Sequence, residues 1–586
     1  MLIINGMEKV LLCTLNAKYI HTSLALRYLQ TYCQSRAEFD ISIKEYTINQ
    51  NTSDIMAEIY LNQPDVLGFS CYIWNIKQIL ELCTDYKKVA PGTVIVLGGP
   101  EVSYDSEQIL SDNPCIDYVV RGEGEQTLQE LLLAINGDLP RSTVTGISYR
   151  EGKQIHRNAD REWITNLDEI PFPYQDDELD RLGDRIVYYE SSRGCPFHCS
   201  YCLSASSGGV RFLSLPRVKE DLAVMLGYNV REIKFVDRTF NCNEKRAIEM
   251  INFIVAHRGT TKIHFEIDAG LFSDEMLDFL TTVPKDLFNF EIGIQSTFEP
   301  ALIAVRRKQN WDRLSNNIKR IKAEDNIHLH LDLIAGLPGE DWENFTRSFN
   351  MVYNLQPDLL QLGFLKILKG TDLLQQCEVY DYIYQSGSPY QVLSNRDLQY
   401  EQIIALTHIE EILDKYYNSG DMVRTIAYIG QEIYSDNIFR FYSDFSIYWQ
   451  SRLLFGLGHK KEVLYNILLA FIAQEHSSHV EVVNELLKYD YLRHNHKYGL
   501  PEGLRSRNPQ NINDLIYSYT KNKNFVTVHL PAFLTKTARE MKKLVHVEYL
   551  NVDPITFEIN CERVFMFVYG PISRKADRII DLTQLI

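Results

Sequence analysis

Strand-like and helix-like segments alternate along most of this chain, and that alternation restricts the fold more than any other feature. Short apolar runs such as EKVLLCTLN (8–16), DVLGFSCY (65–72) and TVIVLGGPEV (93–102) are separated by amphipathic segments such as TSLALRYLQTYC (22–33). Parallel strands need helical crossovers and read as continuous apolar runs. We therefore expect a doubly wound, Rossmann-like α/β domain near the N-terminus.

Two strands of this expected sheet end in glycine-rich turns, LGGPEV (97–102) and VRGEGE (120–125). Ligands of open parallel sheets bind beyond the carboxyl ends of the strands. Glycines at such ends let the backbone approach a large ligand closely. Tight strand-to-helix turns without a ligand would produce the same pattern, so the turns alone leave both interpretations open.

A second alternating series begins at DRIVYYESSRG (184–194), after an expected hairpin at 144–157 and an acidic, proline-containing linker at 166–180. Six strand-helix units across about 185–370 predict a partial (β/α)6 barrel, with its chemistry at the C-terminal ends of the strands. The expected strands after the first are EIKFVD (232–237), KIHFEIDA (262–269), LFNFEIGIQS (287–296), IHLHLDLIAG (327–336) and LLQLGFLKIL (359–368).

From about residue 371 the pattern becomes helical and tyrosine-rich, and strands are expected near NFVTVHL (524–530), VHVEYLN (545–551) and RVFMFVYG (563–570). A chain of 586 residues is too long for one hydrophobic core. The predicted domains are an α/β domain (7–140), a hairpin and linker (141–182), a partial barrel (183–372) and a mostly helical α+β domain that ends in a small β segment (373–586).

Charge and hydropathy exclude some classes of protein. The formal net charge of −17 argues against a surface that grips nucleic acid, because phosphate binding depends on Lys and Arg. We find no apolar run long enough to span a bilayer and no secretory leader. A cytoplasmic location is therefore expected, where most of the eleven cysteines would be core residues or metal and redox ligands.

Three cysteines lie close together in SSRGCPFHCSYC (191–202), directly after the first barrel strand. Cys195, Cys199 and Cys202 have the spacing C-x3-C-x2-C. Thiolates are the protein ligands of iron–sulfur clusters, and three of them on a four-iron cubane leave one iron open for a substrate or cofactor. A zinc site with His198 as the fourth ligand, or three unrelated core cysteines, are the less favoured alternatives.

This motif after the first strand of a partial barrel resembles the signature of the radical SAM superfamily. The resemblance implies a 4Fe-4S cluster on Cys195, Cys199 and Cys202, with S-adenosylmethionine (SAM) on the open iron. FVDRTF, FEIDAG, EIGIQS, DLIAGLPGE and LKILKGT resemble the motifs of the later strands. The residues that the resemblance places around SAM are Tyr201, Asp237, Glu266, Gln295, Gly336, Pro338 and Gly339.

An α/β domain directly before such a barrel resembles the cobalamin-binding radical SAM proteins. The residues that this resemblance assigns to the cobalamin cleft are Ser70, Gly98, Gly99, Pro100, Glu101, Gly122, Glu123 and Gly124. The D-x-H-x-x-G motif of other cobalamin domains is absent, since Asn16 and Lys18 stand where its Asp and His would fall. Cobalt without that lower histidine ligand is therefore implied, and nearby His21 is expected to be a structural or surface residue.

The C-terminal region resembles an uncharacterised domain attached to some cobalamin-binding radical SAM proteins of Firmicutes. Its position favours a substrate-selecting lid and a stabilising cap about equally. The resemblance carries no known activity for this domain.

The activity that the resemblance implies is reductive cleavage of SAM to a 5′-deoxyadenosyl radical. That radical would abstract a substrate hydrogen, and methylcobalamin would then methylate an unactivated carbon. Radical cyclisation or oxidation without methyl transfer, a tRNA methylthiotransferase and a non-enzymatic corrinoid carrier are the alternatives. The implied partners are an unknown substrate (a small molecule, peptide or lipid) and a flavodoxin- or ferredoxin-type electron donor.

Overall fold

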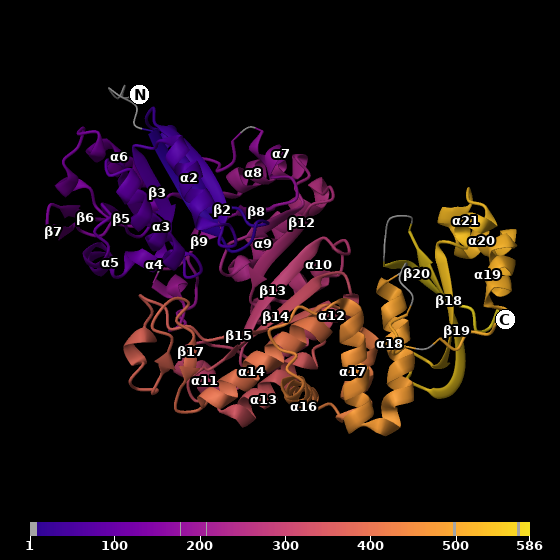
Figure 1. The fold of residues 1–586 in the computed structure, drawn as a ribbon. Helices are drawn as coiled ribbons and strands as arrows, with labels where there is room; N and C mark the ends of the chain where they lie inside the picture. Colours follow the sequence, from indigo (N-terminus) through magenta and orange to yellow (C-terminus); the bar gives the residue numbers. More distant parts are fainter. Residues whose placement is uncertain are drawn as a thin grey trace. The chain divides into compact units, whose positions relative to one another are not determined.

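The first strand of the chain, β1 (Lys9–Asn16), is buried along both faces inside a parallel sheet. In this computed structural model its side chains Leu11 and Leu15 join one hydrophobic core, and Val10 and Leu12 join another. Successive side chains of a strand point to opposite faces, so a strand buried on both faces needs helices on both. The predicted doubly wound α/β fold is confirmed (Figure 1).

The sheet has the order β2-β1-β3-β4-β5-β6-β7, in which β1 to β5 are parallel and β6 and β7 are antiparallel. The hairpin expected over 144–157 is β6–β7, and it extends the sheet at the edge next to β5, a pairing that the sequence did not indicate. The remaining strands are β2 (Asp40–Thr47), β3 (Val66–Ser70), β4 (Val94–Gly98), β5 (Tyr118–Val120), β6 (Ile147–Glu151) and β7 (Gln154–Arg157).

Helices cover this sheet in pairs. Side chains of α2 and α3 belong to one of the two cores, and those of α1 and α6 belong to the other. The helices are α1 (Leu24–Gln34), α2 (Thr52–Asn62), α3 (Ile76–Val89), α4 (Pro100–Ser103), α5 (Ser106–Asp112) and α6 (Gly124–Ile135). The strand order reverses at β1, which has β2 on one side and β3 on the other, so a ligand crevice is expected beyond the ends of β1 and β3.

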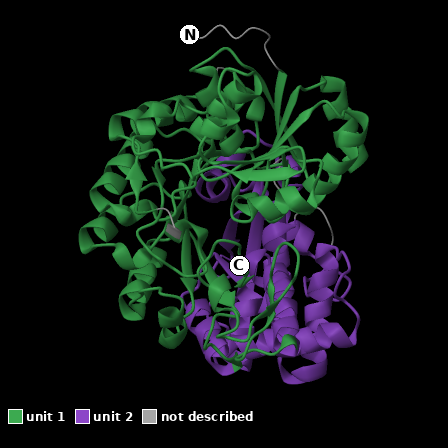
Figure 2. Ribbon diagram, turned by 90° about the vertical axis from the view of Figure 1, so that its left-hand side faces the viewer, with its two compact units in different colours: residues 1–342, 363–400 green, residues 343–362, 401–586 purple. Residues whose placement is uncertain are grey.

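The structure describes residues 9–175, 177–206, 208–495, 500–504, 506–570 and 575–585. Residues 7 and 8, the first of the expected α/β domain, lie outside these ranges. The chain divides into two units (Figure 2). Unit 1 is Met1–Trp342 with Gly363–Tyr400, and unit 2 is Glu343–Leu362 with Glu401–Ile586.

The predicted partial barrel is an open six-stranded sheet with the order β15-β14-β13-β12-β11-β8. The pairs from β8 to β14 are parallel. The strands are β8 (Ile186–Tyr189), β11 (Glu232–Phe235), β12 (Lys262–Ile267), β13 (Phe288–Gln295), β14 (His328–Ala335) and β15 (Leu359–Phe364). The helices between them in unit 1 are α8 (Leu215–Gly227), α9 (Glu244–His257), α10 (Asp274–Leu280), α11 (Glu299–Ala304) and α12 (Trp311–Glu324).

The short strands β9 (Ser192–Arg193) and β10 (Arg211–Phe212) pair antiparallel after β8. Their pairing closes the base of the loop that carries Cys195, Cys199 and Cys202. The cysteine-rich segment is therefore a loop that connects two paired strands.

Unit 2 is mostly helical and ends in an antiparallel sheet of β18 (Val545–Val552), β19 (Ile559–Tyr569) and β20 (Ala576–Asp581). Fully buried aromatic side chains such as Tyr416, Tyr442 and Trp449 lie among its helices. The helices of this unit include α13 (Trp342–Tyr353), α14 (Tyr400–Leu413), α15 (Val423–Tyr428), α16 (Ile438–Ser451), α17 (Lys461–Glu475), α18 (Val480–His494) and α19 (Ile512–Lys521).

The expected strand at 524–530 is wrong, because these residues form helix α20 (Lys523–His529). The Asn522 side chain accepts a hydrogen bond from the Phe525 backbone and caps the helix. Phe525 and Val526 are buried while Val528 is 63% exposed, which is a helical and not an alternating pattern. Asn522, a typical capping residue directly before the apolar run, could have indicated a helix instead of a strand.

Residues 371–399 also differ from the helical pattern expected there. They hold a short 3-10 turn and the two-stranded pair β16 (Ile383–Tyr384) and β17 (Val392–Ser394), and the helices resume at Tyr400. This whole segment belongs to unit 1.

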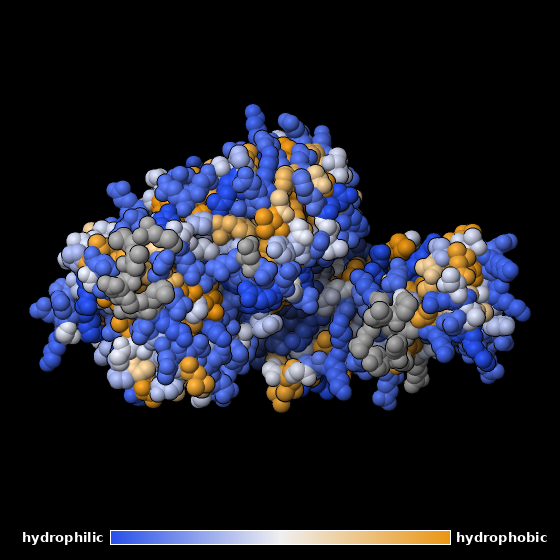
Figure 3. All heavy atoms as spheres, turned by 90° about the horizontal axis from the view of Figure 1, so that it is seen from above, coloured by the Kyte–Doolittle hydropathy of each residue, from blue (hydrophilic) through white to orange (hydrophobic). Residues whose placement is uncertain are grey.

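Hydrophobic residues are scattered among hydrophilic ones on the face drawn in Figure 3. Within the described ranges, the structure holds no helix that combines the length and the apolar character needed to cross a bilayer.

Candidate functional site

A cavity of about 640 Å³ lies at the carboxyl ends of the N-terminal strands in unit 1. Its apolar wall includes Leu12, Leu29 and Leu128, and main chain at Gly68 and Gly98 approaches it closely. Of the residues assigned to the cobalamin cleft, those that line the cavity are Ser70, Gly98, Gly99, Gly122, Glu123 and Gly124. The same cavity is lined on the barrel side by Tyr188, Glu190, Arg193, Val236 and Arg238.

Ser70 offers this cavity an unsatisfied polar atom. The residue is 6% exposed, and its hydroxyl has no hydrogen-bond partner among the described residues. Buried hydroxyls are normally hydrogen-bonded, so this one fits a ligand with polar groups. A roomy, largely apolar cavity with such a group at its wall is compatible with cobalamin, whose corrin ring has apolar faces and carries polar amide side chains.

Gly99 and Gly122, one in each glycine-rich turn, have different surroundings. Gly99 has φ +106°, and a Cβ there would lie 2.6 Å from the carbonyl oxygen of Cys71, so the position requires glycine for packing. Gly122 has φ +73°, and a Cβ there would meet nothing within 4 Å. Only Gly122 therefore faces open space.

The loop after β1 carries no free histidine toward the cavity. The Asn16 side-chain amide donates to the carbonyl of His21 at 3.0 Å, and His21 Nδ1 lies 2.8 Å from the Tyr188 hydroxyl. Burial lowers the pKa of His21, which keeps its imidazole neutral. His21 therefore lines the cavity as a hydrogen-bonded wall residue, and Lys18 is exposed.

Pro100 and Glu101 do not line the cavity, although the resemblance assigned them to it. The Glu101 carboxylate is 3% exposed, accepts a hydrogen bond from the Tyr390 hydroxyl and pairs with Lys369 Nζ at 3.2 Å. Glu101 thus joins the α/β domain to the segment that follows the last barrel strand. The contact of Glu101 with cobalamin stays a prediction, and the pairing of its carboxylate with Tyr390 and Lys369 does not favour it.

Arg193 connects the cavity to the cysteine-rich loop. Its guanidinium pairs with Glu190 at 2.8 Å, with Glu123 at 3.2 Å and, more closely, with Glu125. Glu123 also accepts from Arg211 at 2.7 Å. Carboxylates of the α/β domain therefore form ion pairs with both strands that flank the loop, β9 and β10. Burial raises the pKa of Glu190 to about 7.

The three cysteines occupy one short loop and form no disulfide. The Cys202 backbone donates to the Cys199 carbonyl at 3.1 Å, which fixes a turn between these two residues. Cys195 Sγ lies 3.5 Å from the Thr239 hydroxyl, and Cys199 Sγ lies 4.0 Å from the Arg307 guanidinium. Three thiols beside a buried cation are a donor set that fits an anionic iron–sulfur cluster.

Asp237 anchors the start of this loop. Its carboxylate is 1% exposed and accepts hydrogen bonds from the Ser191 backbone at 2.7 Å, the Ser191 hydroxyl at 2.5 Å and the Ser192 hydroxyl at 2.7 Å. Burial raises the pKa of Asp237, which these hydrogen bonds oppose. The expected contact with SAM stays a prediction, and the neighbouring Arg238 is the residue that lines the cavity.

Glu266 and Gln295 lie on the inward faces of β12 and β13. Burial raises the pKa of Glu266 to about 7, and Arg238 lies 3.9 Å away. The buried Gln295 side-chain oxygen has no hydrogen-bond partner among the described residues, and its backbone φ of +69° is strained for a residue other than glycine. Both side chains are available to a ligand in the barrel.

The turn after β14 is held by its own neighbours. The Gly336 carbonyl accepts from the Tyr382 hydroxyl at 2.9 Å and from Asn395 at 3.1 Å, and the Gly339 backbone donates to Asp397 at 2.7 Å. Pro338 lies between them. Tyr201 packs against a separate apolar cluster of unit 1 that includes Val305, Leu337 and Leu365.

Models of known families match three successive stretches of the chain. The "B12 binding domain" model matches residues 10–132, the "Radical SAM superfamily" model matches 189–352, and a "Protein of unknown function (DUF4080)" model matches 378–565. An α/β domain with a large cavity, next to an open barrel with a three-cysteine loop, defines the class of cobalamin-binding radical SAM proteins. This chain carries one domain matched by each model: a B12-binding domain, a radical SAM domain and a C-terminal DUF4080 domain.

Curated relatives share parts of the chain. It is 34% identical over 235 residues to the uncharacterized methyltransferase PH0819 of Pyrococcus horikoshii, covering 39% of this chain and 51% of that protein. It is 27% identical over 302 residues to the cobalamin-dependent radical SAM methyltransferase TokK of Streptomyces tokunonensis, covering 48% and 44%. The chain spans about half the length of these curated relatives.

Solved structures show the same fold. OxsB, a cobalamin-dependent SAM radical enzyme with aqua-cobalamin bound, has a TM-score of 0.59 and 17% identity, covering 90% of this chain and 81% of that one. The SAM methyltransferase TsrM of Kitasatospora setae has a TM-score of 0.56 and 16% identity, covering 65% and 82%.

Sequence reasoning missed several residues of the site. Arg193 and Arg238 lie next to motif residues, so the sequence placed them near the site. It did not predict their ion-pair partners, Glu125 and Glu266. Arg307 lies far along the chain from Cys199 and follows a helix without any motif. A single sequence holds no signal for such a contact.

Proposed function

We propose that this chain is a cobalamin-dependent radical SAM enzyme that methylates an unactivated carbon of its substrate. The observation that carries the proposal is the shared wall of the 640 Å³ cavity. Gly122 of the α/β domain and Arg238 beside the barrel line the same space, and Arg193 lines it two residues before Cys195. A corrin in this cavity would lie next to the barrel mouth.

The residues divide the work. Cys195, Cys199 and Cys202 would hold the cluster, Ser70 and the glycine turns would border cobalamin, and inward Glu266 and Gln295 would meet SAM. When bound, the reduced cluster and SAM supply a 5′-deoxyadenosyl radical, and methylcobalamin supplies a methyl group. The chain itself orients these groups and, through the apolar wall at Leu12 and Leu128, excludes water from them.

A radical reaction without methyl transfer is the second candidate. The chain is 24% identical over 359 residues to the anaerobic magnesium-protoporphyrin IX monomethyl ester cyclase of Cereibacter sphaeroides, covering 58% of each protein. A tRNA methylthiotransferase is less favoured. Such enzymes use three cysteines of the N-terminal domain for a second cluster, whereas Cys13, Cys71 and Cys83 here are core residues whose pKa values are raised by burial.

Further parts of the proposal concern domains and partners. We place the domain boundaries at 7–140, 141–182, 183–372 and 373–586, with a cytoplasmic location. A flavodoxin- or ferredoxin-type protein would supply the electron, since cleavage of SAM needs a reductant. Unit 2 would act as a lid for the substrate or as a cap.

The deciding experiment is anaerobic incubation of reconstituted protein with SAM and dithionite, with and without methylcobalamin. We expect 5′-deoxyadenosine in both cases and S-adenosylhomocysteine only when cobalamin is present, because remethylation of cobalamin consumes a second SAM. Formation of 5′-deoxyadenosine without any S-adenosylhomocysteine would favour cyclisation or oxidation. Absence of both products would remove the proposal.

A further inference from the structure

The inner face of the barrel in unit 1 is polar, unlike the packed apolar interior of a closed (β/α)8 barrel. Along β11 to β14, side chains alternate between fully buried outward positions and partly accessible inward positions. The inward ionisable residues are Glu232, Lys234, His264, Glu266, Glu291, His330 and Asp332. Because these side chains are partly exposed, solvent reaches the inner face of the sheet, which is called the hollow below.

This hollow carries more negative than positive charge. Four carboxylates face it from these strands, against the ammonium groups of Lys234 and of Lys262 at the exposed start of β12, and the Arg238 guanidinium lies 3.9 Å from Glu266. Lys234 Nζ lies 3.0 Å from Glu291 Oε2, and His264 Nε2 lies 2.8 Å from the same oxygen. Partly buried charges need compensation, so the surplus of carboxylates leaves room for a further cation.

Three donor groups converge in the hollow. One ligand atom each of Glu291, His330 and Asp332 lies within 4.8 Å of the others. His330 Nε2 and Asp332 Oδ1 are 2.9 Å apart and form an ion pair when the imidazole is protonated, and neither buried atom has an aligned hydrogen-bond partner among the described residues. Adjacent ligands around a metal ion are held about 3 Å apart without pointing at one another, as bond lengths near 2.1 Å require.

We propose that Glu291, His330 and Asp332 bind a divalent metal ion inside the barrel. Glu291 would bind the metal through Oε1 while Lys234 and His264 hold Oε2, which is the usual arrangement of outer partners around a ligating carboxylate. Two carboxylates with one imidazole suit Mn²⁺, Fe²⁺ or Zn²⁺. Three protein ligands leave coordination positions open to the hollow for water or an anionic group of a substrate.

Metal titration of the full-length chain tests this site. Cys195, Cys199 and Cys202 are first replaced by Ala, so that no cluster thiol captures the metal. We expect about one Mn²⁺ bound per chain, read from loss of the electron paramagnetic resonance signal of free Mn²⁺, and competition by Zn²⁺. His330→Ala should weaken Mn²⁺ binding at least about tenfold.

The matched control is His328→Ala, at an exposed position on the same strand, which should leave Mn²⁺ binding unchanged. Asp332→Asn keeps the shape of the side chain, so it decides the matter if His330→Ala fails to fold. Absence of saturable Mn²⁺ and Zn²⁺ binding overturns the proposal, and so does binding that neither substitution weakens. The result does not depend on SAM cleavage or on cobalamin.

Discussion

Arg193 at the start of the cysteine-rich loop forms an ion pair with Glu125 in the first turn of α6. The first residue belongs to the barrel and the second to the cobalamin-binding domain, and both line the same cavity. A side chain two positions before a cluster ligand is therefore held by the domain that would bind the second cofactor. The geometry of the loop and the filling of the cavity are physically connected through this pair.

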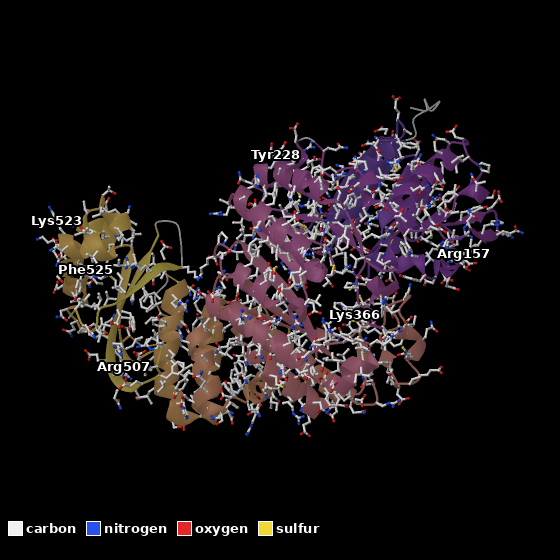
Figure 4. All side chains as sticks on the ribbon, turned by 180° about the vertical axis from the view of Figure 1, so that it is seen from behind. Arg157, Tyr228, Lys366, Arg507, Lys523 and Phe525 are labelled. Carbon is white, nitrogen blue, oxygen red and sulfur yellow. The ribbon has the colours of Figure 1, made fainter. Side chains whose placement is uncertain are left out.

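Replacing Arg193 by Ala should lower the free energy of unfolding by about 3–5 kcal/mol, because Glu123, Glu125 and Glu190 would be left without their shared cation. Urea unfolding measures the loss. Arg157→Ala is the control, since Arg157 forms an ion pair with the exposed Asp160 and a long hydrogen bond to Ser106 Oγ at 3.4 Å, and its loss should cost less than about 1 kcal/mol (Figure 4). Equal effects of the two substitutions would contradict the coupling.

The cluster should contain about four irons and four sulfides per anaerobically reconstituted chain. Replacing Cys195, Cys199 and Cys202 together by Ala should remove the iron and abolish 5′-deoxyadenosine formation. Cys377→Ala serves as the control, because that cysteine lies outside the loop. SAM cleavage by the triple variant, or tightly bound zinc in place of iron in the unaltered chain, would be incompatible with the assignment.

Gly122→Asn should reduce the cobalamin retained after gel filtration, measured by its visible absorption. Asparagine tolerates the positive φ at this position, and its side chain would extend into the open space next to the cavity. Gly137→Asn is a matched control, since Gly137 has φ +88°, open space and no place in the cavity. Gly99 is unsuitable, because any side chain there meets the Cys71 backbone.

Glu266 should make stability depend on pH. Its pKa is raised from 4.5 in the unfolded chain to about 7 by burial, so the folded state binds the proton more tightly. The stabilisation by the protonated form is complete below pH 4.5 and is lost as pH rises to 7. Glu266→Gln should therefore gain stability over the unaltered chain between pH 5 and pH 8, as measured by urea unfolding. A constant difference across that range would show an unshifted carboxyl.

Asp237→Asn should destabilise the protein more than Glu266→Gln does at pH 5. An amide nitrogen cannot accept the hydrogen bonds that Ser191 and Ser192 donate to the carboxylate, and an unsatisfied buried donor costs about 1–3 kcal/mol. Thermal unfolding gives the comparison. Unchanged stability with weakened SAM binding would instead restore the predicted SAM contact.

Much of the fold follows from local pattern. The runs at 93–102 and 287–296 are apolar at strand spacing, and helical segments lie between such runs, so parallel order is the only economical connection. Local pattern misled at 524–530, where β-branched residues form α20. There the Asn522 cap and burial of one helical face outweigh intrinsic strand preference, which is weak on its own.

The sequence alone determined the class of chemistry, since the spacing of Cys195, Cys199 and Cys202 lies within one loop and needs no tertiary contact to be read. Tertiary structure decided which of the other residues meet one another. Asp237 accepts a hydrogen bond from the Ser191 backbone, and Glu101 forms an ion pair with Lys369. Ligand atoms of Glu291, His330 and Asp332 lie close together. These partners come from different strands and domains, and only the packing of the folded chain brings them together. The spacing of residues along a single sequence therefore does not predict these contacts.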